Sequence, residues 1–227
     1  MSSEIGLLLV HGWGCGPGIW RPLMRHFPGH PVCRPDLGFF GARAGSVPST
    51  GEWVAIGHSL GFLWLLTQLP LAPPPLIRAL VAINGFSRFS HTSDFPQGVP
   101  LPILRRMMTK LRQQPSSVLY DFLQRSGWAS GHGVAPITAT NPDIEALAQG
   151  LCWLMEWDGR PVINRLTTLP LLVLAAQDDQ IVPPPLTEAA FAATPINWSA
   201  TGGHLLPLTR SDWCALQLRL LLRTLAP

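Results

Sequence analysis

Four short, continuous apolar runs, each ended by glycine or polar residues, constrain the fold of this chain more than any other feature. They lie at residues 5–10, 53–56, 79–83 and 171–176. Runs of this length without polar alternation are typical of strands buried on both faces of a sheet. Segments with helical patterning separate them, and strands that alternate with helices favour a parallel sheet covered on both faces. The sequence therefore predicts an α/β fold.

The length and composition favour one domain, because 227 residues that are 47% hydrophobic and 13% charged can build one sizeable core. We therefore treat residues 1–227 as a single domain. The remaining expected elements are helices at 19–27, 186–193 and 212–225, a helix after residue 59, and short strands at 32–34 and 196–198.

The alternation breaks between approximately residues 86 and 169, where we expect a helical cap insertion. One helix candidate has apolar residues at i, i+3, i+4 and i+7 over 104–111, and a second covers 118–123. A third is expected to begin at Asn141, a capping residue followed by proline, and to end near residue 157. No convincing strand falls in this segment.

Residues 57–61 read Gly-His-Ser-Leu-Gly and lie between a predicted strand and a predicted helix. In a tight strand-to-helix turn only small neighbours fit, and the turn lifts the serine oxygen clear of the sheet. Ser59 is therefore a candidate nucleophile. The alternative is an ordinary serine that caps the helix.

A serine hydroxyl needs a base that is oriented by an acid. An acidic pair, Asp178 and Asp179, follows the apolar run at 171–176, and His204 follows the next predicted strand. The order serine, acid, histidine and the placement of all three after strands favour a catalytic triad. The pattern of residue types alone leaves the choice between the two aspartates open.

The segment at residues 11–14, His-Gly-Trp-Gly, follows the first predicted strand. A loop in this position can direct a backbone N–H toward the nucleophile. The N–H groups of Trp13 and Leu60 are therefore the expected donors of an oxyanion hole.

These motifs together resemble the α/β-hydrolase superfamily over nearly the whole chain. Within it the chain is most similar to the esterases that remove the methyl group from pimeloyl-acyl carrier protein in biotin synthesis. The shared details include the tryptophan after His-Gly, the Phe-Ser-rich segment 86–90 and the Trp-Asp-Gly-Arg segment 157–160. The resemblance implies a serine carboxylesterase that works through an acyl-enzyme without a metal or organic cofactor. Its D-x-x-V-P spacing assigns the acid to Asp179 and leaves Asp178 as a solvated loop acid.

The resemblance also implies an acyl carrier protein as partner, held by basic residues of the cap. Here the basic residues cluster at Arg105, Arg106, Lys110 and Arg112, which form either such a docking patch or a solvated helix face. Phe122 and Trp128 are candidates for an acyl pocket, or for ordinary cap packing, and His58 is expected in the pocket wall.

Other function classes remain open or are disfavoured. The same triad serves thioesterases, acyltransferases and short-chain carboxylesterases, and a non-catalytic acyl-binding or carrier-binding protein could keep the fold. The net charge of +3 without a dense basic run argues against nucleic acid as a partner.

The location of the protein is inferred from its first apolar run and its cysteines. The run at 5–10 is too short for a signal peptide or a membrane span, so we expect a soluble cytoplasmic protein. The four cysteines stand far apart without metal-ligand spacing, which predicts free thiols. The oligomeric state stays open.

Overall fold

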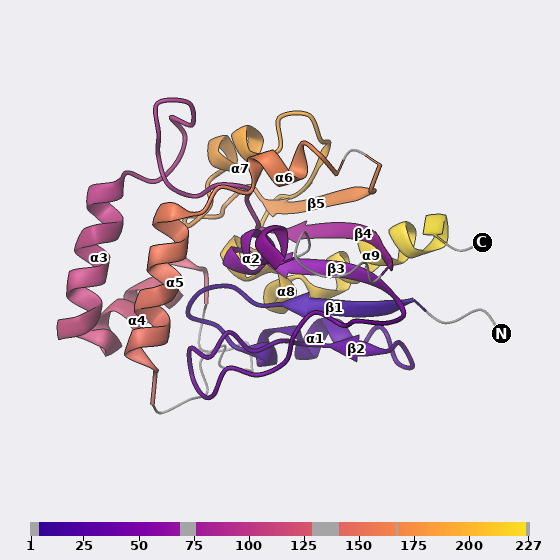
Figure 1. Cartoon of the computed structure of the whole chain (residues 1–227), viewed down its shortest axis with the longest axis horizontal. Helices are drawn as coiled ribbons and strands as arrows, with labels where there is room; N and C mark the ends of the chain where they lie inside the picture. The colour runs from indigo at the N-terminus through magenta and orange to yellow at the C-terminus, as the bar shows by residue number, and fades with distance from the viewer. Residues whose placement is uncertain (1–4, 69–75, 129–140, 167, 226–227) are drawn as a thin grey trace.

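A computed structural model describes residues 5–68, 76–128, 141–166 and 168–225 (Figure 1). Its centre is one six-stranded sheet with the order β2-β1-β3-β4-β5-β6, and every neighbouring pair is parallel. The strands are β1 (Gly6–Val10), β2 (Val32–Cys33), β3 (Glu52–His58), β4 (Leu76–Ile83), β5 (Leu171–Ala176) and β6 (Ile196–Ser199). The expected parallel α/β architecture is confirmed.

Helices lie between most of these strands and after the last of them. In chain order they are η1 (Pro17–Trp20), α1 (Arg21–Met24), α2 (Leu60–Gln68), α3 (Leu101–Gln113), α4 (Pro115–Arg125), α5 (Ile144–Glu156), α6 (Arg160–Ile163), α7 (Pro184–Ala190), η3 (Gly203–Leu205), α8 (Leu206–Thr209) and α9 (Ser211–Leu225).

The central strands β1, β3, β4 and β5 bury both faces, which explains their continuous apolar sequences. Along β1, Leu8 and Val10 belong to a core shared with α2, whereas Leu7 and Leu9 belong to a core shared with α1, α8 and α9. Figure 1 shows α2 in front of the sheet and α9 behind it. The side-chain period of two thus divides each of these central strands between two hydrophobic cores.

The segment between β4 and β5 carries α3, α4 and α5, which lie together beyond the carboxyl ends of the strands (Figure 1). Leu104 and Leu111, both from the expected apolar stripe, are buried on the inner side of α3. Residues 129–140 and 167 of the expected cap lie outside the described residues. The described cap helices therefore cover the edge of the sheet where β3, β4 and β5 end.

Two expected helix boundaries are wrong. The segment 19–27 is no single helix but η1 followed by the one-turn α1, because Pro22 has no N–H to continue the hydrogen-bond ladder. Helix α5 begins after Asp143 instead of Asn141. The Asp143 carboxylate accepts the N–H of Ala146 at 2.9 Å, while its own N–H donates to the carbonyl of Phe39 at 2.9 Å, and this tertiary contact fixes the start of the helix.

An ion cluster joins the two ends of the cap. Arg88, after β4, and Arg160, at the start of α6, both donate to the Asp158 carboxylate, at 2.8 and 2.6 Å. Arg160 also reaches Asp94 at 2.8 Å. Partial burial alone would raise the pKa of the Asp158 carboxyl, but these hydrogen bonds outweigh it and lower the pKa to about 2.

We expect Asp158→Asn to lower the free energy of unfolding by about 1–2 kcal/mol at pH 7. The loss is this small because 26% of the Asp158 side chain is exposed to water, which screens its charge. The pKa of the folded state lies below the ordinary value, so this stabilisation is complete above about pH 4 and is lost as the pH falls through about 2. Denaturant unfolding of both variants from pH 7 to pH 2 should show the difference shrinking. Glu188 is an exposed carboxylate on α7, so Glu188→Gln is the control. Its difference in the free energy of unfolding from the wild type should stay small and should not change in this way with pH.

Candidate active site

Ser59 lies in the sharp turn between β3 and α2, with φ at +53°. The turn is tight because a Cβ atom on Gly57 would meet the backbone of Phe62, and one on Gly61 would meet the carbonyl oxygen of Val10. Both flanking glycines are therefore required by close backbone packing. The strained conformation of Ser59 is of the kind found at nucleophile turns.

The structure brings Ser59, His204 and Asp179 together. The His204 Nε2 atom lies 2.9 Å from the Ser59 Oγ atom, and His204 Nδ1 lies 2.8 Å from Asp179 Oδ2. A carboxylate only accepts hydrogen bonds, so the proton of a neutral His204 belongs on Nδ1 and leaves Nε2 free to accept from Ser59. The imidazole and the carboxylate are both shielded from water, since neither side chain is exposed.

Four donors surround the Asp179 carboxylate. Oδ1 accepts the backbone N–H groups of Ile181 and Val182 at 2.7 and 2.9 Å. Oδ2 accepts His204 and also the Asn84 side-chain amide at 2.6 Å. Burial alone would raise the pKa of Asp179, but the nearby His204 and these hydrogen bonds outweigh it and lower the pKa. The group is therefore ionised at neutral pH, although it is buried.

Asp178 is solvent-exposed in its loop, as expected, but it also has a structural role. Its two oxygens accept the backbone N–H groups of Gly203 at 2.8 Å and Gly202 at 3.2 Å. Both glycines have positive φ angles and directly precede His204. Asp178 thus ties the loop of the acid to the loop of the histidine.

His58 is not in the cavity wall, contrary to the expectation. It is fully buried behind Ser59, and its Nε2 lies 2.8 Å from the carbonyl oxygen of His204. Burial, followed by the proximity of His204, lowers the pKa of His58 to about 3. A neutral His58 can donate a hydrogen bond to that carbonyl and so hold the His204 backbone in place. His58 is the last residue of β3, and its side chain does not line the cavity.

The loop after β1 is anchored on both sides. His11 Nε2 accepts the backbone N–H of Leu37 at 3.0 Å, and the indole N–H of Trp13 donates to the carbonyl of Leu147 on α5 at 2.8 Å. The first bond fixes the loop to the segment after β2, and the second fixes it to the cap.

The two expected oxyanion donors flank Ser59. Leu60 is the first residue of α2, where backbone N–H groups have no partner within the helix. The loop that carries Trp13 passes directly against the turn, since a Cβ on Gly12 would lie 2.8 Å from the Ser59 Cβ. Within the described ranges, neither the Trp13 nor the Leu60 amide donates to another protein group. Both N–H groups thus remain available for a ligand beside Ser59.

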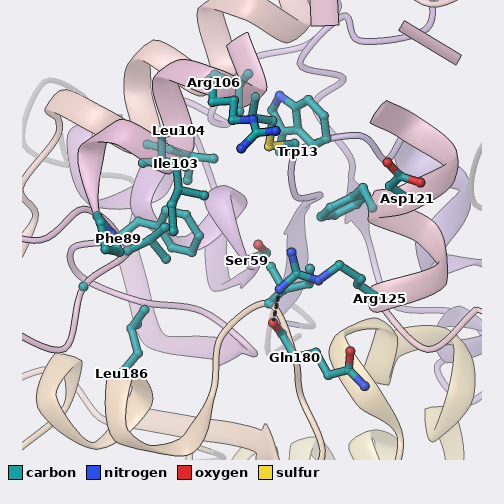
Figure 2. Close-up of a pocket in the computed structure, with 18 of the residues that line it drawn as sticks. Trp13, Ser59, Phe89, Ile103, Leu104, Arg106, Asp121, Arg125, Gln180 and Leu186 are labelled. Carbon is teal, nitrogen blue, oxygen red and sulfur yellow. Dashed lines mark hydrogen bonds between the residues drawn. The ribbon is translucent and has the colours of Figure 1, made fainter. Parts of the chain in front are cut away.

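A cavity of about 540 Å³ opens above Ser59, between the cap helices and the carboxyl ends of the strands (Figure 2). Most of its wall is apolar. The apolar lining comes from Trp13, Phe89, Val99, Ile103, Leu104, Met107, Val118, Phe122, Leu151, Leu154, Ile181 and Leu186. Such a wall suits an alkyl or acyl chain better than a sugar or nucleotide.

Charged side chains also line the cavity. Lys110 pairs with Asp121 at 2.8 Å across α3 and α4. Arg125 donates to the carbonyl of Gln180 at 3.4 Å, beside Ser59 in Figure 2. Arg106 is exposed and forms no ion pair with the described residues. Because Asp121 neutralises Lys110, the remaining Arg106 and Arg125 give this wall a net positive charge.

The structure separates the predicted cap residues into two groups. Phe122 and Arg106 line the cavity, whereas Trp128 and Arg105 do not. Gly127, with φ at +80°, turns the chain away after α4, and Trp128 packs against the core behind the sheet. Arg105 lies about 100° from Arg106 around α3, which directs it away from the opening.

Asn84 was missed by the sequence analysis. It is the residue directly after β4, the strand that separates β3 from β5. A polar residue at the carboxyl end of that strand was a usable signal, because neighbouring parallel strands end at the same edge of the sheet.

Gly61→Ala should lower the free energy of unfolding by about 3 kcal/mol or more, because the new methyl group would overlap the Val10 carbonyl. Thermal unfolding of the purified variant measures this loss. Gly16→Ala is the matched control, since a Cβ atom there would meet nothing within 4 Å. Equal stability of the two variants would contradict the steric account of the turn.

Known proteins resemble the chain in sequence and in fold. A pimeloyl-[acyl-carrier protein] methyl ester esterase of Xanthomonas oryzae pv. oryzae is 30% identical over 233 residues, covering 91% of this chain and 90% of that protein. The protein of the same name from Stenotrophomonas maltophilia is 29% identical and covers 97% of this chain and 94% of that protein. No protein-family model matches.

Solved structures show the same fold at lower identity. An esterase from Exiguobacterium antarcticum superposes with a TM-score of 0.84 at 14% identity, covering 98% of this chain and 93% of its own. A thermophilic esterase from Thermogutta terrifontis has a TM-score of 0.77 at 20% identity, covering 99% and 92%.

No helix in the described part of the chain is long and apolar enough to cross a membrane. Among the same residues, no group of three or more histidine, cysteine or acidic side chains is arranged to hold a metal ion.

Sequence identity over nine-tenths of both chains and the shared fold place this chain in the pimeloyl-[acyl-carrier protein] methyl ester esterase family of the α/β-hydrolase superfamily.

Proposed function

We propose that the chain hydrolyses the methyl ester of a pimeloyl group carried on acyl carrier protein, with Ser59 as nucleophile, His204 as base and Asp179 as the orienting acid. The assignment of these roles is supported by two hydrogen bonds. His204 Nε2 lies 2.9 Å from Ser59 Oγ, and His204 Nδ1 lies 2.8 Å from Asp179 Oδ2. The substrate part rests on family membership and on the apolar cavity beside Ser59.

In the first half-reaction, the Ser59 oxygen attacks the ester carbonyl carbon while His204 Nε2 accepts the hydroxyl proton. The N–H groups of Trp13 and Leu60 hold the resulting oxyanion, and one such donor is worth roughly 10²–10³ in rate. The bond to the methoxy oxygen then breaks, and His204 returns the proton to release methanol. An acyl-enzyme on Ser59 remains.

In the second half-reaction, a water molecule attacks the acyl-enzyme. His204 takes a proton from this water, and the tetrahedral intermediate forms in the same pair of N–H groups. Its collapse returns the proton to the Ser59 oxygen and releases the carboxylic acid, which then loses its proton to water. Asp179 keeps the Nδ1 proton of His204 in place and stabilises the imidazolium in both halves.

The cavity wall favours an acyl substrate with a charged carrier. The apolar side chains can enclose the alkyl chain, and the exposed Arg106 can attract the acidic surface of a carrier protein. Arg105 is set away from the cavity, so it contributes only if the carrier also covers the outer face of α3.

Ser59→Ala should abolish activity, with kcat falling by on the order of 10⁴-fold or more, because the nucleophilic oxygen is lost. The assay is the intact mass of acyl carrier protein loaded with methyl-pimeloyl, which should lose the methyl group and keep its thioester with the wild type alone. Covalent labelling by a fluorophosphonate should likewise disappear in the variant. Ser87→Ala is the control, because this buried hydroxyl donates to the Ala190 carbonyl and does not line the cavity.

The two readouts separate the parts of the proposal. Labelling of Ser59 without any loss of the methyl group would keep the serine hydrolase and overturn the substrate, leaving a carboxylesterase for another acyl ester. Loss of the thioester in place of the methyl ester would identify a thioesterase. Absence of labelling in the wild type would overturn the mechanism itself.

Arg106→Glu should raise the KM for the carrier-borne ester by about fivefold or more at low salt, because a like charge would then face an acidic carrier. Steady-state rates at low and high salt measure the effect, which should shrink as salt rises. Arg165→Glu makes the same charge change outside the cavity lining and should leave KM unaltered. An identical response of the two variants would argue against carrier attraction at the cavity.

A further inference from the structure

We propose that Asn84 is a positioning residue that holds the Asp179 carboxylate against His204, an inference that rests on the proposed function. The Asn84 side-chain nitrogen lies 2.6 Å from Asp179 Oδ2, the same oxygen that accepts His204 Nδ1 at 2.8 Å. It also lies 3.4 Å from the carbonyl oxygen of Gly203, next to His204. One amide group thus reaches both the acid and the loop of the base.

The backbone of Asn84 is fixed to the sheet on both sides. Its N–H donates to the carbonyl of Leu174 on β5 at 2.8 Å, and the preceding carbonyl of Ile83 accepts the N–H of Ser59 at 3.1 Å. Asn84 therefore stands between the strand that presents Ser59 and the strand that presents Asp179. A change in the position of Asn84 would therefore also shift Ser59 and Asp179.

The conformation of Asn84 limits which residues can stand there. Its φ is +47°, a left-handed value that asparagine, aspartate and glycine tolerate best. Glycine has no side chain to offer, and an ionised aspartate would repel Asp179. Asparagine is the member of this set that donates a hydrogen bond at every pH.

Packing alone does not explain a polar side chain at this place. Asn84 is 1% exposed, and its Oδ1 atom has no hydrogen-bond partner in the described part of the chain. A buried carbonyl oxygen without a partner costs stability. The amide nitrogen is aimed at the carboxylate despite this cost, which points to a function in the Asp179–His204 pair.

The amide donor has two effects on Asp179. The two backbone N–H groups hold Oδ1, so the Asn84 bond fixes the remaining oxygen and stops the carboxylate from rotating away from His204. A hydrogen bond to the charged form also favours that form. His204 therefore meets an ionised acceptor in a single orientation.

The other titratable and charged groups around the pair come from three elements. His58, at the end of β3, contacts the His204 backbone. It is neutral, because burial and, to a smaller extent, the nearby His204 lower its pKa to about 3. Asp178 bonds to Gly202 and Gly203 in the loop after β6. Arg125, at the end of α4, donates to the carbonyl next to Asp179. None of these replaces the bond from Asn84 to Oδ2.

The first variant is Asn84→Gly, which keeps the left-handed backbone and removes only the amide. We expect kcat to fall by about tenfold or more, on the scale of one charge-assisted hydrogen bond. KM should stay within about twofold of the wild type, because Asn84 does not line the cavity. Thermal unfolding checks that the variant is folded.

The second variant is Asn84→Asp, which places two carboxyl groups in contact. When they share one proton, the new group can still donate to Asp179. When that proton leaves at higher pH, the two charges repel and the carboxylate turns away from His204. Asn84→Asp should therefore lose activity on an alkaline limb that neither the wild type nor Asn84→Gly shows. A residue with a packing role alone would produce no such limb.

A proton NMR signal of the His204 Nδ1–H group supplies a readout that needs no turnover. Its downfield resonance, assigned by its loss in His204→Gln, should shift in Asn84→Gly and stay in place in Ser87→Ala. An unmoved resonance in Asn84→Gly overturns the positioning role, even if kcat falls. If the resonance shifts but Ser59 of the wild type takes no fluorophosphonate, the positioning role stands and the proposed function fails.

Discussion

The contact on which the rest of the site depends is the close approach of the backbone at residues 57–62 to β1. A Cβ atom on Gly61 would overlap the Val10 carbonyl, and one on Gly57 would overlap the backbone of Phe62. The turn between them can therefore hold Ser59 in its left-handed conformation with no freedom to relax. A parallel sheet buried on both faces supplies the rigidity that this strain requires.

The electrostatics of the site follow from burial. Asp179 is ionised in a place without water because four donors from three segments share its charge. His58, directly behind, stays neutral because burial and the adjacent His204 lower its pKa to about 3. A second positive charge there would compete with the imidazolium that the proposed mechanism forms on His204. In a medium of low dielectric these fixed groups act more strongly than they would in water.

The cap and the catalytic loops form one connected structure. The N–H of His204 donates to the carbonyl of Ser126 at the end of α4, at 3.1 Å, and the Trp13 indole donates to Leu147 on α5 at 2.8 Å. Phe122, from α4, meets the rings of both Trp13 and His204 edge to face. The helices that enclose the substrate cavity thus also support the groups proposed to do the chemistry.

The strands, the turn at Ser59 and the order serine, acid, histidine could be predicted from the sequence, because local patterns of apolar residues, glycine and polar residues after strands indicate them. The choice of Asp179 came from the resemblance to the α/β-hydrolases. Which polar groups meet depends on the tertiary structure. Asn84, Asp178 and His58 owe their contacts to strands that end at the same edge of the sheet but lie far apart in the chain. The same holds for the cap. The helical spacing of apolar residues predicted which side of α3 is buried, whereas the residues that line the cavity depend on how α3, α4 and α5 pack over the sheet.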